Sequence, residues 1–213
     1  GLVPATLLIV AVLGSILMGI ASPTEAAAVG AAGALALSIL YREVSWRIVA
    51  DSLAQTIRVT SMIMFTVLGG TMFTGIFAAT GGGRLLASIV GGLGLSEGML
   101  VFLFLTIIFA AGFVLDWISI VLICIPIFAP LVKAAGIDPL WFAVLVCIAI
   151  QTSYLTPPMA PSIFYLRAIA PPDFTYGHMY RGVVPYVAMQ LLTLAVVAAI
   201  PAAATWLPNA LFR

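Results

Sequence analysis

A pair of prolines interrupts one of the long apolar stretches of this chain. Residues 151–158 read QTSYLTPP, and an apolar run resumes after them and continues to Leu166. Each proline lacks a backbone N–H and disfavours the α region for the residue before it, so a continuous helix cannot pass this point undisturbed. In a bilayer, the carbonyl groups freed in this way are tolerated only where they are buried in protein or line a polar cavity. The sequence therefore predicts a broken helix with a polar site at its break.

Composition places this break in a membrane. The 213 residues are 64% hydrophobic and only 7% charged, whereas a soluble domain carries about 25% charged residues. The expected fold class is all-α: a polytopic membrane protein embedded in the lipid bilayer. The net charge of +1 argues against nucleic acid as a partner.

A second polar interruption lies inside another apolar run. The stretch from Met99 to Val132 is nearly continuous, yet Asp116 stands at its centre in the sequence GFVLDW. Each half has only about 15 residues, which is shorter than the roughly 20 that a membrane-spanning helix needs. This pattern predicts a re-entrant helical hairpin whose tip stops inside the membrane.

Apolar run lengths divide the rest of the chain. We expect one membrane domain, 1–213. Its expected parts are scaffold helices at 1–80 with an amphipathic segment at 42–58, an arm at 84–97, the re-entrant hairpin at 98–133, the broken helix at 140–170 and a final helix at 182–207.

The polar residues of the two interruptions are the candidates for binding. A carboxylate deep in an apolar run is a functional candidate, because exposing it to lipid is costly; Asp116 could bind Na⁺, carry a proton, or cap the helix that starts at Trp117. At the break, Thr156 offers a hydroxyl beside freed carbonyls, which are hard oxygen ligands. Gln151, Thr152 and Ser153 could join this site or form hydrogen bonds between helices.

Two half-helices are expected to begin at these interruptions, near Trp117 and near Met159. The positive end of a helix dipole favours an anion, so their meeting at the midplane predicts a site for a small carboxylate. The predicted substrate-binding residues are Trp117, Gln151, Thr152, Ser153, Met159 and Ala160.

No constellation of catalytic residues stands out. The chain has no HExxH or GxSxG motif and no paired acids. Cys124 and Cys147 lie in apolar runs and are interpreted as small hydrophobic residues, and His178 stands alone in a polar loop. We expect neither an enzyme nor a cofactor, and no metal ion beyond Na⁺.

Four stretches resemble a known family. They are GIASPTEAAAVGA at 19–31, GFVLDW at 112–117, PIFAPLVKAAGIDPLWF at 126–142 and QTSYLTPPMAPSIFYLRAIAPP at 151–172. Together they resemble the C-terminal half of the large permease subunit of tripartite ATP-independent periplasmic (TRAP) transporters, and the similarity spans nearly the whole chain. The sequence departs from that pattern at Met159-Ala160-Pro161, which adds a third proline, at Ser119 and at Ile150.

The resemblance implies two inverted repeats, of which this chain supplies the second, and Na⁺-coupled uptake of a small organic acid of the 2-oxo acid or dicarboxylate type. The implied partners are the first repeat of the same permease, a small four-helix membrane subunit and a periplasmic substrate-binding protein. The cation-binding residues implied by the match are Gly112, Leu115, Asp116, Thr156, Pro157 and Pro158, largely through backbone carbonyls.

The distribution of Lys and Arg suggests an orientation in the bacterial inner membrane. Five basic residues would share one face and three the other, which puts loops 42–58 and 167–181 in the cytoplasm and the C-terminus in the periplasm. Two alternatives stay open: a divalent-anion/Na⁺ symporter that needs no binding protein, and a non-transporting membrane scaffold or truncated remnant.

Overall fold

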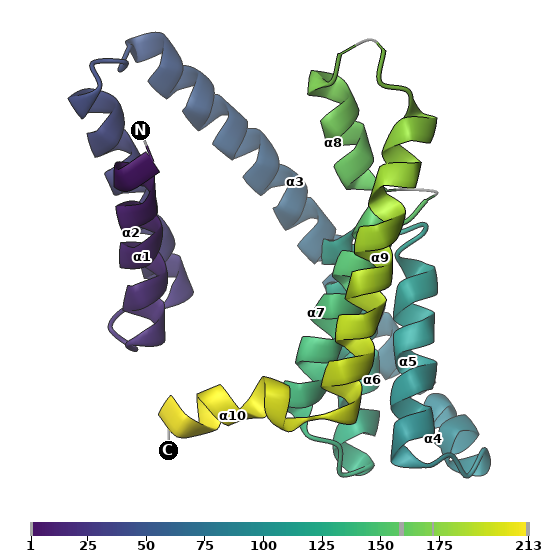
Figure 1. The fold of residues 1–213 in the computed structure, drawn as a ribbon. Coiled ribbons are helices and arrows are strands. Elements are labelled where there is room, and N and C mark those ends of the chain that lie inside the picture. Colours follow the sequence, from purple (N-terminus) through teal and green to yellow (C-terminus); the bar gives the residue numbers. More distant parts are fainter. Residues whose placement is uncertain (1, 158–159, 172, 212–213) are drawn as a thin grey trace. The chain divides into compact units, whose positions relative to one another are not determined.

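The protein is built of helices only over the residues that the computed structural model describes, which are 2–157, 160–171 and 173–211. Ten helices follow one another in this part of the chain (Figure 1). Their bounds are α1 Leu2–Leu17, α2 Pro23–Leu40, α3 Trp46–Ala79, α4 Gly82–Gly92, α5 Glu97–Ala111, α6 Trp117–Ala134, α7 Pro139–Leu155, α8 Pro161–Ile169, α9 Tyr176–Ala199 and α10 Ala202–Leu211.

Four of these helices, α2, α3, α6 and α9, are long and apolar enough to cross a membrane. Many large apolar side chains are exposed to the surroundings, Phe65 at 79% and Phe102 at 73% among them. In water such a surface would be a strong aggregation hazard, but in lipid it is the expected exterior. The chain is therefore an all-α, multi-pass membrane protein.

The chain divides into two compact units, residues 1–62 and 63–213. In the first unit, α1 and α2 pack against each other, joined by a turn that ends in a capping box. Glu25 N–H donates to the Ser22 hydroxyl, and Ser22 N–H donates to the Glu25 carboxylate at 2.8 Å. A Cβ on Gly30 would lie 3.4 Å from Val12 of α1, so small residues of α2 allow the two helices to approach closely.

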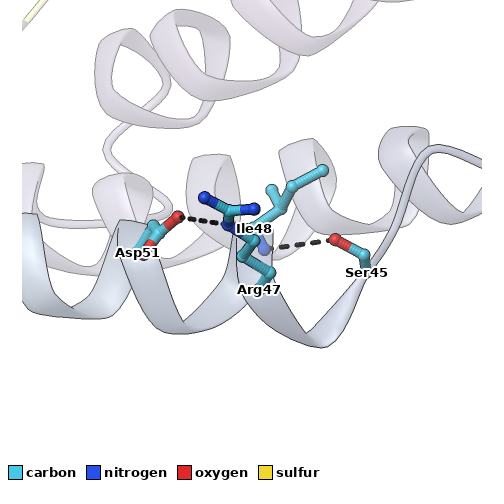
Figure 2. Close-up of polar contacts among 4 residues, drawn as sticks. All are labelled: Ser45, Arg47, Ile48 and Asp51. Carbon is cyan, nitrogen blue, oxygen red and sulfur yellow. Dashed lines mark hydrogen bonds and ion pairs between the residues drawn. The ribbon is translucent and has the colours of Figure 1, made fainter.

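Residues 46–58 of the amphipathic segment predicted at 42–58 form one continuous helix, α3, with the third span. Ser45 caps it by accepting from Ile48 N–H at 3.2 Å, and Arg47 Nε lies 3.9 Å from Asp51 Oδ2 one turn further on (Figure 2). No glycine or proline occurs between Trp46 and Leu68, so nothing interrupts the backbone hydrogen bonds where polar residues give way to apolar ones. The change in polarity alone does not end a helix.

The core of the second unit lies between α5, α6 and α7. Phe104 of α5 stacks on Phe128 of α6 with ring centroids 4.3 Å apart, and meets the edge of Phe142 of α7 at 6.2 Å. These rings are among the most buried side chains of the unit. They fix the hairpin formed by α5 and α6 against the first half of the broken helix, α7.

Helix α9 packs along α7, and its Val197 carbonyl accepts a hydrogen bond from Trp141 Nε1 at 2.8 Å. The expected final helix at 182–207 differs from the structure at both ends. The helix begins earlier, at Tyr176, where Thr175 caps it, and it ends at Ala199. Pro201 cannot donate a backbone hydrogen bond, so the chain turns there and α10 starts as a separate helix.

A single glycine sets the distance between α3 and α6. Gly70 is buried, and a Cβ at this position would lie 2.9 Å from Leu122 Cβ of α6. We expect Gly70→Ala to lower the stability of the second unit by about 1–3 kcal/mol, because Leu122 Cβ is attached directly to the backbone and cannot move aside as a side-chain tip can. Thermal unfolding in detergent measures this, and Gly69→Ala, whose added Cβ meets no atom within 4 Å, is the matched control. Equal midpoints for the two variants would show that this contact is not formed.

Candidate functional site at the hairpin tip and the helix break

Asp116 caps the N-terminus of α6 at the tip of the hairpin. One carboxylate oxygen accepts from Ile118 N–H at 3.2 Å, and the other accepts from the Ser119 hydroxyl. Of the roles expected for Asp116, capping is thus observed directly. The carboxylate is exposed, and it retains lone pairs for a further ligand.

The tip also carries carbonyl oxygens without hydrogen bonds. The N–H groups of Phe113, Val114 and Leu115 donate back to carbonyls at the end of α5, at 2.8–3.2 Å. No hydrogen bond within the described part of the chain reaches the carbonyl oxygens of residues 112–115. Carbonyls left without donors at membrane depth are ligands for a small hard cation.

Helix α7 ends at Leu155, where the two prolines predict an interruption. Ser153 and Tyr154 carbonyls would normally accept from residues 157 and 158, but both of those are prolines without an N–H. Thr156 N–H compensates partly by donating to the Ser153 carbonyl at 3.1 Å. The next helix, α8, starts only at Pro161, after Ala160 adopts a positive φ of 33°.

Three hydroxyl groups near this break donate to carbonyls of their own helix. Thr152 donates to Ile148, Ser153 to Ile150 and Thr156 to Thr152, at 2.7–2.8 Å. Their O–H donors are therefore in use, whereas their oxygen lone pairs are available as acceptors. The break thus presents oxygen acceptors, which suit a cation.

The hairpin tip packs directly on the end of α7. Gly112 is buried, and a Cβ on it would lie 2.5 Å from Ser153 Cβ and would overlap with the Ser153 hydroxyl oxygen. Beside this contact is a cavity of about 50 Å³, large enough for a cation with one or two waters. The residues lining it are Gly112, Leu115, Asp116, Trp117, Ile120, Ile150, Ser153, Tyr154 and Pro161.

The structure brings together five of the residues singled out from the sequence: Gly112, Leu115, Asp116, Trp117 and Ser153. The other predicted site residues are not among those that line the cavity. Gln151 is exposed and is not part of the cavity lining, Thr152 is fully buried, and Ala160 is buried at the start of α8. Thr156 and Pro157 belong to the break itself, and Pro158 and Met159 lie outside the described residues.

Sequence reasoning missed Tyr154, Ile150, Ile120 and Pro161 as lining residues. A signal for two of them was present, since Ile150 and Tyr154 share a helix face with Ser153 at spacings of three, four and one. Choosing residues by polarity, without following that face, left them out.

A second and larger hollow, of about 440 Å³, lies between α5, α7 and α9. Its walls are almost wholly apolar, with Phe102, Phe109 and Leu191 among them, and Thr152 is the single predicted site residue that it includes. Both hollows are lined mostly by apolar atoms, and the smaller one differs in that Asp116 and Ser153 are among its lining residues.

Comparison with known proteins identifies relatives of this chain. The family model of the tripartite ATP-independent periplasmic transporter, DctM component, matches residues 1–203. The C4-dicarboxylate TRAP transporter large permease protein DctM of Pseudomonas aeruginosa is 31% identical over 204 residues, which cover 95% of this chain and 47% of that protein.

Two further relatives have similar coverage. The sialic acid TRAP transporter large permease protein SiaM of Vibrio cholerae is 30% identical, over 94% of this chain and 47% of the relative. The 2,3-diketo-L-gulonate TRAP transporter large permease protein YiaN of Escherichia coli is 31% identical, over 92% and 46%. The chain thus spans about half the length of the curated relatives it matches, and it belongs to the DctM family of large permease components of tripartite ATP-independent periplasmic transporters.

Proposed function

We propose that this chain forms one half of a large TRAP permease and holds a Na⁺ site between the hairpin tip and the helix break. The complete permease couples the entry of Na⁺ to the uptake of a small organic acid. The observation that carries the proposal is the contact between Gly112 and Ser153. It brings the hairpin tip, which carries free carbonyls, against Ser153 in the last turn of α7, just before the break. Such oxygen ligands at the ends of half-helices are how secondary transporters bind Na⁺.

The length of α5 supports a re-entrant hairpin. Its 15 residues extend about 22 Å, which is short of the roughly 30 Å of hydrocarbon in a bilayer. The 18 residues of α6 extend about 27 Å, close to that thickness, so the short α5 is what favours a tip within the membrane, at a depth where a cation needs protein ligands. We also propose that the protein lies in the bacterial inner membrane, with loops 42–58 and 167–181 in the cytoplasm.

The substrate class follows from chemistry and from relatives. The names of the matched permeases include a C4-dicarboxylate, sialic acid and 2,3-diketo-L-gulonate, which all carry a carboxylate. A bound Na⁺ beside the site would attract such an anion, and by linkage each ligand would raise the affinity for the other by the same factor. The partners that we propose are the other half of the permease, a small membrane subunit and a periplasmic binding protein.

Uptake into proteoliposomes tests this function. A permease that contains this chain is reconstituted with its small subunit, and labelled succinate, 2-oxoglutarate and sialic acid are supplied with the binding protein. We expect uptake that requires both a Na⁺ gradient and the binding protein. Na⁺-dependent uptake without the binding protein would contradict the tripartite mechanism, and no dependence on Na⁺ would contradict the coupling.

Thr156→Ala should raise the Na⁺ concentration for half-maximal uptake about tenfold, because it removes a hydroxyl oxygen at the break. A tenfold change corresponds to about 1.4 kcal/mol, a reasonable size for one ligand of a hydrated cation. Thr156→Ser, which keeps the oxygen, should stay close to wild type. The matched control is Thr193→Ala in α9, where the hydroxyl makes the same bond to the carbonyl four residues back, at 2.9 Å. Equal Na⁺ dependence in both alanine variants would remove Thr156 from the site.

A further inference from the structure

The larger hollow of the second unit is a groove along α7. Helices α5 and α9 each pack on α7, but they do not pack closely on each other (Figure 1). The groove lies between them, and side chains of all three helices line it over a volume of about 440 Å³. Small residues, Ala149 of α7 and Ala195 of α9 among them, leave the space open.

The polar side chains that line this groove already have partners for their donors. The hydroxyls of Thr106 and Thr152 donate to carbonyls four residues back in their own helices, both at 2.8 Å. Trp141 Nε1 donates to the Val197 carbonyl, also at 2.8 Å. No charged side chain is among the described residues that line the groove. It therefore offers a ligand an apolar surface and no unused side-chain donor.

One end of the groove lies where the three helices begin or end. Gly98 near the start of α5, Trp141 near the start of α7 and Ala198 near the end of α9 all line it. Helix ends that carry polar caps, with a tryptophan beside them, are typical of the membrane surface. We therefore place the mouth of the groove at that level.

The length of the groove matches one leaflet of the bilayer. Its lining extends from Gly98 to Phe109 on α5 and from Trp141 to Thr152 on α7, and each of these stretches is about 16 Å long. The hydrocarbon core is about 30 Å thick, so the groove reaches from the surface to about the middle of the membrane.

The volume fits an acyl chain and excludes a helix. A methylene group takes up about as much space as a water molecule, roughly 30 Å³, so 440 Å³ holds about 15 methylene groups. That is the size of one phospholipid acyl chain. A helix about 10 Å across would occupy about 1,250 Å³ over the same length, so a helix of a partner subunit is too thick to enter.

The rim of the groove continues the surface that faces lipid. Phe102 of α5 and Leu191 of α9 line it from two sides, and they are 73% and 47% exposed. Helix α9 is itself apolar enough to span the membrane. Phospholipid chains that surround these exposed side chains can thus enter the groove without crossing a polar barrier.

We propose that the groove between α5, α7 and α9 binds one acyl chain of a membrane phospholipid. Its headgroup lies at the surface near Gly98 and Trp141, and the end of the chain lies beside Phe109 and Thr152. The bound chain fills the space between α5 and α9. This site does not depend on the proposed function, because the lipid binds whether or not Na⁺ drives transport.

Photo-crosslinking in the assembled permease tests the proposal. Phosphatidylethanolamine with a diazirine near the end of one acyl chain is added to the purified permease in mild detergent, excess lipid is washed away, and the labelled residues are identified by mass spectrometry after irradiation. We expect saturable labelling at Phe109 and Thr152, at least fivefold stronger than at Phe65 of α3, which is 79% exposed. Unlabelled phosphatidylethanolamine should compete with the labelling in the groove.

A variant that fills the groove makes the test specific. Ala195→Phe places a ring in the space for the chain and should lower labelling in the groove at least fivefold. The matched control is Ala188→Phe, at an exposed alanine of α9 that is not among the lining residues, and it should be labelled like wild type. Thermal unfolding of both variants shows whether they are folded.

Three results would overturn the proposal. Labelling in the groove no stronger than at Phe65, or without competition by unlabelled lipid, would mean that ordinary boundary lipid is all that is present. Undiminished labelling in a folded Ala195→Phe variant would mean that the chain lies elsewhere. Labelling by diazirine-bearing palmitic acid but not by the phospholipid would mean that the ligand is a free fatty acid.

Discussion

Gly112→Ala should reduce Na⁺-dependent uptake by more than tenfold while the protein still inserts in the membrane. The added methyl group would overlap with the Ser153 hydroxyl and lie 2.5 Å from Ser153 Cβ, so the hairpin tip would have to move away from α7. Such overpacking costs about 1–3 kcal/mol, and the movement separates the two sets of carbonyls that form the candidate Na⁺ site. Uptake at several Na⁺ concentrations measures the loss.

Two companion variants make this result specific. At Gly98, near the start of α5, an added Cβ meets no atom within 4 Å, so Gly98→Ala should transport like wild type. The double variant Gly112→Ala/Ser153→Gly removes the atoms that the new methyl group meets and should recover part of the uptake, as expected for residues in direct contact. If Gly112→Ala alone transports normally, or if the double variant is no better than the single one, the tip and α7 do not meet as described.

The positions of the breaks could be predicted from the sequence because their causes are local. Pro157 and Pro158 remove donors whichever way the protein folds, and Asp116 followed by an apolar run is a typical N-cap. The single-domain interpretation and the roles assigned to the site residues stay predictions. From the sequence alone one can predict which helices are interrupted and which residue types stand at each interruption.

Contacts between the interruptions could not be predicted in the same way. The approach of Gly112 to Ser153 depends on the packing of Phe104, Phe128 and Phe142, which brings α5 and α7 together. The start of α8 depends on a positive φ of 33° at Ala160. Residues other than glycine seldom adopt this conformation.

The predicted helix boundaries differ from the structure where hydrophobicity was used to decide where a helix begins or ends. The segment at 42–58 is polar enough to suggest a separate interfacial helix, yet α3 begins at Trp46 and continues beyond the segment without a break. Conversely, the apolar run beyond Ile200 suggests one long helix, yet Pro201 divides it. In both places the backbone donors, and not the hydrophobicity, decide where a helix ends.

Replacing Asp116 by asparagine should separate its two roles. Asparagine is as good an N-cap as aspartate, so Asp116→Asn should keep the wild-type unfolding temperature, but the loss of the charge should raise the Na⁺ concentration for half-maximal uptake at least tenfold. Asp116→Ala loses both roles. It should lose about 1 kcal/mol of stability, because the cap is removed, and its Na⁺ concentration for half-maximal uptake should be at least as high as that of Asp116→Asn. Thermal unfolding and uptake at varied Na⁺ concentration measure the two effects separately.

Asp138 is the matched control, because it caps α7 in the same way, accepting from Leu140 and Trp141 N–H at 2.8 and 3.0 Å. It lies at the opposite end of α7 from the break. Asp138→Ala should therefore lose stability and keep its Na⁺ dependence, and Asp138→Asn should resemble wild type in both respects. A wild-type Na⁺ dependence in Asp116→Asn would mean that Asp116 only caps α6, and that the backbone carbonyls of the tip and the break bind the cation without it.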